Sequence, residues 1–176
     1  MSVVVIGVNH RTSPLQVLEK VAINPTDMSK ALHSLSSRNN IREAVVLSTC
    51  NRTEVYAITE KFHAAYADIS DFFCELGGLV PDELNNHLYS QHDDAAITHL
   101  FEVACGLDSA VIGENEILGQ VRDAWTNAQS EGASRSTLNL LFRHALETGK
   151  RARTETAISR STTSISFAAV EMARDL

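Results

Sequence analysis

The chain has 176 residues, of which 44% are hydrophobic and 21% are charged, and its formal net charge is −7. This composition is ordinary for a soluble globular protein and excludes a disordered one, and the length allows one full domain, with or without a small appendage. The acidic balance disfavours nonspecific nucleic-acid binding, and no apolar run approaches the roughly 20 residues that span a bilayer.

The N-terminus and the cysteines indicate a cellular compartment. The first residues, MSVVVI, lack the basic region, apolar segment and small-residue cleavage site of a signal peptide. The three cysteines, Cys50, Cys74 and Cys105, are odd in number and widely spaced, which argues against a disulfide framework. We therefore predict a cytoplasmic protein with no membrane segment.

The first ninety residues mix strand-like and helix-like segments, which predicts an α/β arrangement. Short apolar or β-branched runs predict strands over residues 3–9, 43–48 and 53–59, with a further short extended piece over 87–91. Apolar residues at helical spacing predict helices over residues 12–23, 24–37 and 62–78. The second and third strands flank a short polar loop, so we expect them to form a hairpin.

From residue 93 onward the pattern is nearly all helical. Periodicity, caps and glycine stops predict helices over residues 93–107, 116–132, 136–155 and 164–176. The last predicted helix is still apolar and amphipathic at Leu176, which suggests that the chain is a piece of a longer protein. The predicted division is an α/β part over 1–92 followed by a helical part.

Two kinds of binding motif are absent from the sequence. The eight glycines form neither a G-x-G-x-x-G nor a P-loop pattern, so no dinucleotide or nucleotide phosphate site is recognisable. No C-x-x-C or H-x-x-x-H pair occurs, so we predict no metal site.

The hairpin loop STCNRT carries a candidate nucleophile, Cys50. A thiol reacts as its thiolate, which a nearby cation favours, and Arg52 follows two residues later. The alternative is a small residue that happens to lie in a loop. For Cys74 and Cys105, on apolar helix faces, we expect core packing.

Other polar residues stand in apolar surroundings. His10 ends the first strand and His99 lies in AITHLFEV; each is either functional or a hydrogen-bonded, half-buried histidine. The segment LDSAVIGENEILGQVR mixes glycine with polar residues, as pocket-lining loops do, although helix capping by Glu114 or Asn115 explains part of it. Its polar residues are Ser109, Glu114, Asn115, Glu116 and Gln120.

A basic segment lies near the end of the chain, where five cations face two carboxylates. It contains Arg143, Lys150, Arg151, Arg153 and Arg160, with Glu147 and Glu155. The segment is either a local nucleic-acid contact or a solvated helix face with intrahelical ion pairs.

Taken in order, GVNHRTSPL, LSTCNRTEVY, GLDSAVIGENEILGQVR, and KRARTET with STTSISFAAVEMAR resemble the catalytic domain of the glutamyl-tRNA reductases. The resemblance covers essentially the whole chain. It implies an NADP-dependent oxidoreductase that reduces glutamyl-tRNA(Glu) to glutamate-1-semialdehyde. That reaction is the first step of the five-carbon route to 5-aminolevulinate and the porphyrins.

The resemblance also implies roles for residues. Cys50 is the expected nucleophile that forms a glutamyl thioester, and His99 is expected to assist proton transfer or to orient the ester. Arg52 suits the free side-chain carboxylate of the glutamyl group. The implied substrate-binding residues are Thr49, Cys50, Asn51, Arg52, Ser109, Glu114, Asn115, Glu116 and Gln120.

For the fold, the resemblance implies a ferredoxin-like subdomain over 1–92, a helical subdomain over 93–160, and over 161–176 the start of a long linking helix. NADPH-binding and dimerisation domains are expected outside this chain, which is therefore at most a glutamyl-tRNA esterase by itself. The implied partners are glutamyl-tRNA(Glu), a second copy in the full-length homodimer, and glutamate-1-semialdehyde aminomutase. The basic segment then becomes a candidate tRNA contact.

Two other functions remain open from the sequence. One is a noncatalytic tRNA-binding or protein-binding module that keeps the fold, in which Cys50 is unreactive. The other is a thiol hydrolase of small esters, although the sequence offers no clear Cys–His–Asn order for it.

Overall fold

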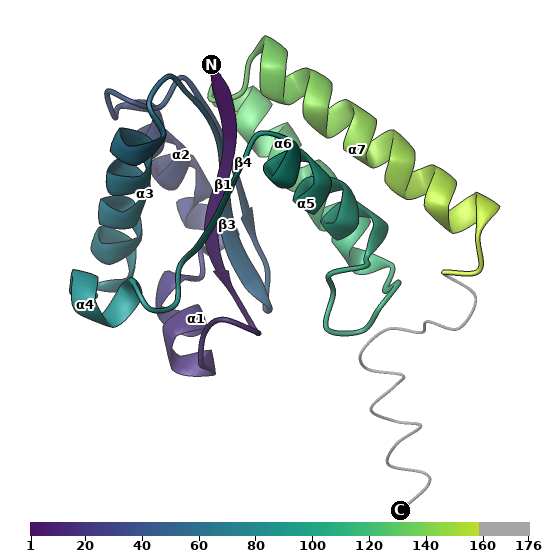
Figure 1. Ribbon diagram of the computed structural model, residues 1–176, viewed down its shortest axis with the longest axis horizontal. Helices are drawn as coiled ribbons and strands as arrows, with labels where there is room; N and C mark the ends of the chain where they lie inside the picture. Colours follow the sequence, from purple (N-terminus) through teal and green to yellow (C-terminus); the bar gives the residue numbers. More distant parts are fainter. Residues whose placement is uncertain (159–176) are drawn as a thin grey trace, which may run out of the picture.

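The computed structural model describes residues 1–158 as a central sheet with helices on both faces. Figure 1 shows α1 to α4 on one side of the sheet and α5 to α7 on the other. The predicted helix over 164–176 and the predicted linking segment over 161–176 lie outside the described residues. Within 1–158, no helix is both long and apolar enough to cross a bilayer.

The sheet has four antiparallel strands. They are β1 (Ser2–Asn9), β2 (Glu43–Ser48), β3 (Arg52–Thr59) and β4 (Tyr89–His92), in the order β2-β3-β1-β4. Helices connect β1 to β2 and β3 to β4, while a short turn joins β2 to β3. This β-α-β-β-α-β arrangement confirms the predicted ferredoxin-like fold and, since the sheet is antiparallel, places it in the α+β class.

The helices of the first face are shorter than the sequence predicts. They are α1 (Leu15–Val21), the 3-10 turn η1 (Pro25–Asp27), α2 (Met28–Ser36), α3 (Phe62–Gly77) and α4 (Pro81–Leu84). Pro14 occupies the N-cap position of α1. Its fixed φ suits the start of a helix, but its side chain cannot accept a hydrogen bond from the first turn. Gly78 caps the C-terminal end of α3, and its φ of +58° is the left-handed conformation that glycine adopts most readily. The sequence reasoning missed α4.

Three helices cover the second face: α5 (Asp94–Cys105), α6 (Glu116–Ser130) and α7 (Ser136–Glu155). The buried carboxylate of Glu43 on β2 accepts hydrogen bonds from the N–H groups of Arg135, Thr137 and Leu138, at 2.8, 3.2 and 2.9 Å. It thus satisfies the free donors at the start of α7 and fixes that helix to the sheet.

Coverage on both faces explains why β3 is buried at every residue. A strand buried on both sides has no solvent face, so its polar residues must find partners inside the protein. The partners of Arg52, Glu54 and Tyr56 on this strand build the candidate site.

Candidate active site

Cys50 lies at the tip of the β2–β3 hairpin. The N–H of Thr49 donates to the carbonyl of Arg52 at 2.8 Å, which leaves Cys50 and Asn51 as the two turn residues. Neither has a positive φ, so the turn is not one of the mirror-image types that two-residue hairpins favour. Two other contacts hold it: the N–H of His10 donates to the Asn51 carbonyl at 2.9 Å, and the Asn51 N–H to Thr49 Oγ1 at 3.2 Å. The turn therefore presents an exposed thiol from a backbone tied to the end of β1.

A small pocket surrounds this turn. Its walls come from the hairpin and from the segment between α5 and the first turns of α6. Its lining includes eight of the nine predicted substrate-binding residues: Thr49, Cys50, Asn51, Arg52, Ser109, Glu114, Glu116 and Gln120. The space is about 20 Å³, room for about one water molecule. The structure thus brings two distant sequence segments to one thiol; whether they bind substrate stays a prediction.

Two predicted residues lie outside this pocket. Asn115 lies on the other side of α6, in a separate pocket with Arg122 and Lys150. His99 is buried on α5, with Nε2 3.0 Å from Glu54 Oε1. It therefore connects to the Cys50 pocket through Glu54 and Arg52.

Glu114 serves as a helix cap as well as a pocket wall. Its carboxylate accepts hydrogen bonds from the N–H groups of Glu116 at 2.9 Å and Ile117 at 3.0 Å, and lies 3.5 Å from Ser109 Oγ. The capping interpretation is confirmed for Glu114. Asn115, at the N-cap position itself, makes no side-chain cap.

Glu54 is the centre of a buried hydrogen-bond network. Its carboxylate is fully buried and accepts hydrogen bonds from Arg52 Nη1 at 2.7 Å, His99 Nε2 at 3.0 Å, Tyr56 Oη at 2.6 Å, and the hydroxyl of Tyr89. Four donors satisfy a carboxylate that would otherwise be costly to bury.

These contacts fix the protonation of the network. Burial by itself raises the pKa of Glu54, but the hydrogen bond from His99 and the charge of Arg52 outweigh it and lower the pKa to about 2. An ionised carboxylate only accepts, so His99 carries a proton on Nε2. Burial and the charge of Glu54 raise the pKa of both Tyr56 and Tyr89, which keeps their hydroxyls as donors.

Arg52 joins the two walls of the pocket. Although burial disfavours its charge, Glu54 and the other nearby groups raise its pKa. Nη1 donates to Asp108 Oδ2 at 3.0 Å as well as to Glu54, and Nη2 donates to the Asp108 carbonyl at 2.5 Å. Asp108 also pairs with the exposed Arg11 at 2.6 Å. A guanidinium has five N–H donors, and within residues 1–158 the Nε–H and one Nη2–H of Arg52 have no acceptor.

Gly7 makes room for this network. In the sheet register Gly7 on β1 lies between Glu54 on β3 and Tyr89 on β4. A Cβ at Gly7 would lie 2.5 Å from the Thr53 carbonyl oxygen and 2.9 Å from Glu54 Cγ. The absence of a side chain lets Tyr89 reach across β1 to Glu54.

His10 lies beside the same turn. Its Nδ1 is buried and has no hydrogen-bond partner among the residues that the structure describes, while its backbone N–H donates to Asn51. Burial, and then the charges of Arg11 and Arg52, lower the pKa of His10, which favours the neutral imidazole.

Sequence reasoning missed Glu54, Tyr56, Tyr89 and Asp108. A signal existed for the first two, because Arg52, Glu54 and Tyr56 are polar at every second position of one strand and so share a face. Tyr89 and Asp108 gave no local signal, since they are 35 and 56 residues from their partners.

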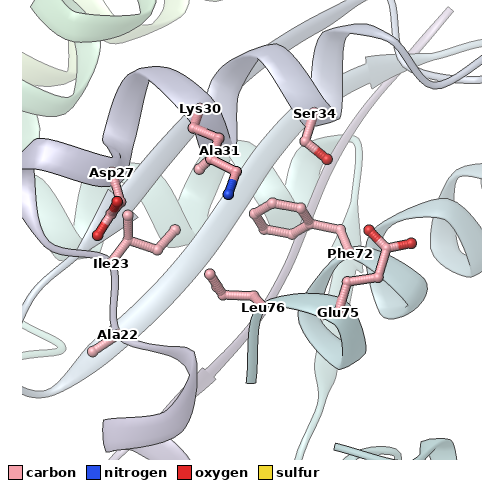
Figure 2. Close-up of a pocket in the computed structure, with 9 residues that line it drawn as sticks. All are labelled: Ala22, Ile23, Asp27, Lys30, Ala31, Ser34, Phe72, Glu75 and Leu76. Carbon is pink, nitrogen blue, oxygen red and sulfur yellow. The ribbon is translucent and has the colours of Figure 1, made fainter. Parts of the chain in front are cut away.

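A larger cavity lies elsewhere, between α2 and α3. Figure 2 shows its apolar floor, with Ile23, Phe72 and Leu76, and the side chain of Lys30 directed toward it. Its volume is about 420 Å³, and none of the predicted site residues lines it. Nowhere in residues 1–158 do three His, Cys, Asp or Glu side chains gather as a metal-binding group.

Comparison with known proteins identifies the family. Residues 6–156 match the family model described as "Glutamyl-tRNAGlu reductase, N-terminal domain". The chain belongs to the glutamyl-tRNA reductase family. The resemblance read from the sequence is thereby confirmed.

The glutamyl-tRNA reductases that this chain matches are longer than the chain itself. The glutamyl-tRNA reductase of Frankia alni is 48% identical over 98% of the chain and 37% of its own length. The glutamyl-tRNA reductase of Bacillus subtilis is 42% identical over 100% of the chain and 39% of its own length. The structure of "Glutamyl-tRNA Reductase from Methanopyrus kandleri" superimposes with a TM-score of 0.75 at 35% identity, covering 98% of the chain and 39% of its own. The chain thus spans about two fifths of the length of the curated relatives it matches.

Proposed function

We propose that this chain is the part of an NADPH-dependent glutamyl-tRNA reductase that binds the glutamyl group and transfers it to Cys50. The observation that carries the proposal is the exposed Cys50 thiol at a braced hairpin tip, in one pocket with Ser109, Glu114 and Gln120. The products assigned to the whole enzyme are glutamate-1-semialdehyde and free tRNA, at the start of porphyrin biosynthesis in the cytoplasm.

The proposed step is an acyl transfer. The Cys50 thiolate attacks the ester carbonyl of glutamyl-tRNA, and the C–O bond to the terminal ribose breaks. The ribose oxygen takes up a proton and leaves as a hydroxyl, and the glutamyl group remains on Sγ as a thioester. Water attacking the same thioester would release glutamate, which is the esterase activity expected of the chain by itself.

Arg52 is proposed to select the glutamyl side chain. Its contacts with Glu54 and Asp108 hold the guanidinium in place and leave the Nε–Nη2 edge for a ligand. Two parallel N–H donors match a carboxylate, which would distinguish glutamate from glutamine. A glutamyl group is larger than the present pocket, so we expect the pocket wall around Ser109 to move away from Cys50 when substrate binds, while Arg52 keeps its contacts with Glu54 and Asp108.

His99 is proposed to orient the site through Glu54. Its imidazole donates to the carboxylate that holds Arg52, so it acts on the side chain that would grip the substrate. An interaction through a shared carboxylate fits the orienting role better than direct proton transfer.

The hydride donor, NADPH, is assigned to the part of the full-length enzyme that this chain does not include. The Cys50 pocket of about 20 Å³ has no room for a dinucleotide, and the chain has no glycine-rich phosphate loop. The Cys50 pocket therefore does not fit the cofactor. The homodimer and a complex with glutamate-1-semialdehyde aminomutase are likewise proposals for the whole protein.

Intact-protein mass spectrometry tests the acyl transfer. The chain is mixed with glutamyl-tRNA without NADPH, beside the variants Cys50→Ser and Cys74→Ser. We expect a glutamyl mass increment, or thiol-dependent loss of glutamate from the tRNA, in the wild type and in Cys74→Ser. The matched control removes a half-buried thiol on α3 that is remote from the pocket.

Loss of both signals in Cys50→Ser alone would establish the nucleophile. A wild-type chain that binds the tRNA but neither gains mass nor discharges it would contradict the proposal and favour the noncatalytic binding module. Turnover of small esters without tRNA would favour the thiol hydrolase.

A further inference from the structure

A second pocket lies against α6, and its charged lining is entirely basic. Its volume is about 300 Å³, and its cations are Arg122 on α6 and Lys150 and Arg153 on α7, with Asn115 at one end. Among residues 1–158, no carboxylate lines it. In a chain of net charge −7 this is a local reversal of sign, which attracts an anion specifically to that place.

The basic pocket and the Cys50 pocket share one helix. Glu116, Ile117 and Gln120 of α6 line the Cys50 pocket, whereas Leu118, Gly119 and Arg122 line the basic one. These two sets point to opposite sides of a helix that is about 10 Å thick with its side chains. A ligand that passes over the first turn of α6 can therefore reach both pockets.

Arg153 ties the two pockets together. Its guanidinium donates to the carbonyl oxygens of Ala104 at 2.9 Å, Gly149 at 3.0 Å and Glu114 at 3.1 Å. Glu114 is the residue whose carboxylate caps α6 at the Cys50 pocket. The position of the cation is thus fixed relative to the thiol by one shared residue.

Lys150 and Gly119 leave the basic pocket open for a ligand. Lys150 is exposed and makes no ion pair within residues 1–158, whereas the neighbouring Arg151 pairs with Glu155 at 3.0 Å. A Cβ at Gly119 would meet only Arg122 Nη2, at 4.0 Å, so no side chain fills the space above this turn.

We propose that the basic pocket binds a phosphodiester of the tRNA acceptor end while the glutamyl ester lies in the Cys50 pocket. This inference rests on the proposed function and adds to it a phosphate subsite with named residues. The first phosphodiesters lie one and two nucleotides from the ester, which matches a ligand that crosses one helix. Lys150 supplies the charge, together with Arg122, whose guanidinium also pairs with the exposed Asp123 at 3.1 Å. Arg153 fixes the geometry of the wall.

The test compares two stable analogues that differ in phosphate. One is adenosine that carries glutamate in amide linkage at its ribose and has no phosphate. The other is the trinucleotide CCA with the same glutamyl amide and two phosphodiesters. Binding of each is measured by calorimetry at several salt concentrations for the wild type, Lys150→Gln and Lys61→Gln.

Lys61→Gln is the matched control, because it removes the same charge from an exposed lysine just before α3, outside the pocket lining. We expect Lys150→Gln to weaken CCA-analogue binding about tenfold and to reduce its salt slope by about 0.7. Its affinity for the adenosine analogue should stay unchanged, and Lys61→Gln should resemble the wild type with both. Urea unfolding of Lys150→Gln should match the wild type, since this lysine makes no ion pair among the described residues.

The outcomes separate the two proposals. A wild type that binds neither analogue would overturn the proposed function, and the phosphate subsite with it. A wild type that binds both analogues, with Lys150→Gln equal to Lys61→Gln, would overturn the phosphate subsite alone. Lys150-dependent binding of NADPH, with no effect on the CCA analogue, would assign the pocket to dinucleotide phosphate and also overturn the inference.

Discussion

The cavity between α2 and α3 and the pocket beside Cys50, on opposite faces of the sheet, differ in volume and in chemistry. The cavity under α2 and α3 measures about 420 Å³ and has an apolar floor, with no cysteine or histidine from residues 1–158 in its lining. The pocket beside Cys50 measures only about 20 Å³, although cavities of about 300 and 470 Å³ lie elsewhere on its face, and most of the predicted residues converge on it. Volume therefore does not single out the candidate site; the convergence of braced polar groups does.

The charged pairs on the two faces differ in how far they are buried. Arg52 and Glu54 are 2% and 0% exposed and share a network with His99 and two tyrosines. On the other face Arg38 pairs with Glu75 at 2.6 Å, but the Glu75 side chain is 65% exposed. A buried pair loses solvation in both partners and depends on its geometry, whereas an exposed pair is replaced by water at little cost.

Substitution of the two carboxylates gives the largest expected contrast. Glu54→Gln removes the charge that balances buried Arg52, and we expect it to lower the free energy of unfolding by about 3 kcal/mol. The matched control, Glu75→Gln, should lower it by less than about 1 kcal/mol. Urea denaturation of the chain measures both. Equal effects would show that the two ion pairs do not differ in burial as the structure has them.

The pH dependence of the free energy of unfolding reports on the Glu54 carboxylate. The folded pKa of Glu54, about 2, lies below its ordinary value of 4.5. Its stabilisation is therefore complete above about pH 4.5 and is lost as the pH falls toward 2, by about 3 kcal/mol in total. Unfolding measured between pH 6 and 2 should show this loss in the wild type, and Glu54→Gln should lack that part of the slope. A slope unchanged in Glu54→Gln would assign the acid sensitivity to other carboxylates.

A pair of glycine substitutions tests the close packing above Glu54. Gly7→Ala places a methyl group 2.5 Å from the Thr53 carbonyl, and we expect a loss of about 1–3 kcal/mol in the free energy of unfolding. Gly119→Ala adds the same atom to an open helix position, where alanine should be neutral or stabilising by up to about 1 kcal/mol. Thermal unfolding compares them. A tolerated Gly7→Ala would mean that β1 and β3 can separate without loss of the network.

The smallest effect on stability is expected from a substitution at the cavity between α2 and α3. Lys30 is exposed and makes no ion pair among the described residues, so Lys30→Gln should change the free energy of unfolding by no more than about 0.5 kcal/mol. It should leave the glutamyl increment on Cys50 unchanged in the mass spectrum. A reduced increment would mean that the α2–α3 cavity takes part in the reaction and would remove the contrast between the two faces.

Much of the fold could be predicted from the sequence, because strands and helices follow local patterns. The β2–β3 hairpin, the strand over 3–9 and the helices on both faces occur where the periodicity places them, with bounds that differ by a few residues. Helix α4 was missed because Pro81–Leu84 is too short to show a period. The candidate site residues came from motifs, and the structure brings the hairpin and the segment from Ser109 to Gln120 into one pocket.

The sequence by itself determined the order of the elements, the cysteine turn and the family, since these depend on residues that are neighbours in the chain. Only the tertiary structure decided which side of α6 each polar residue occupies, and it separates Asn115 from Glu114. It also decided that Arg52 meets Asp108 and that Glu54 meets His99, across 56 and 45 residues. The physical reason is that a buried carboxylate takes its partners from whatever packs against it, and packing joins residues that no local pattern connects.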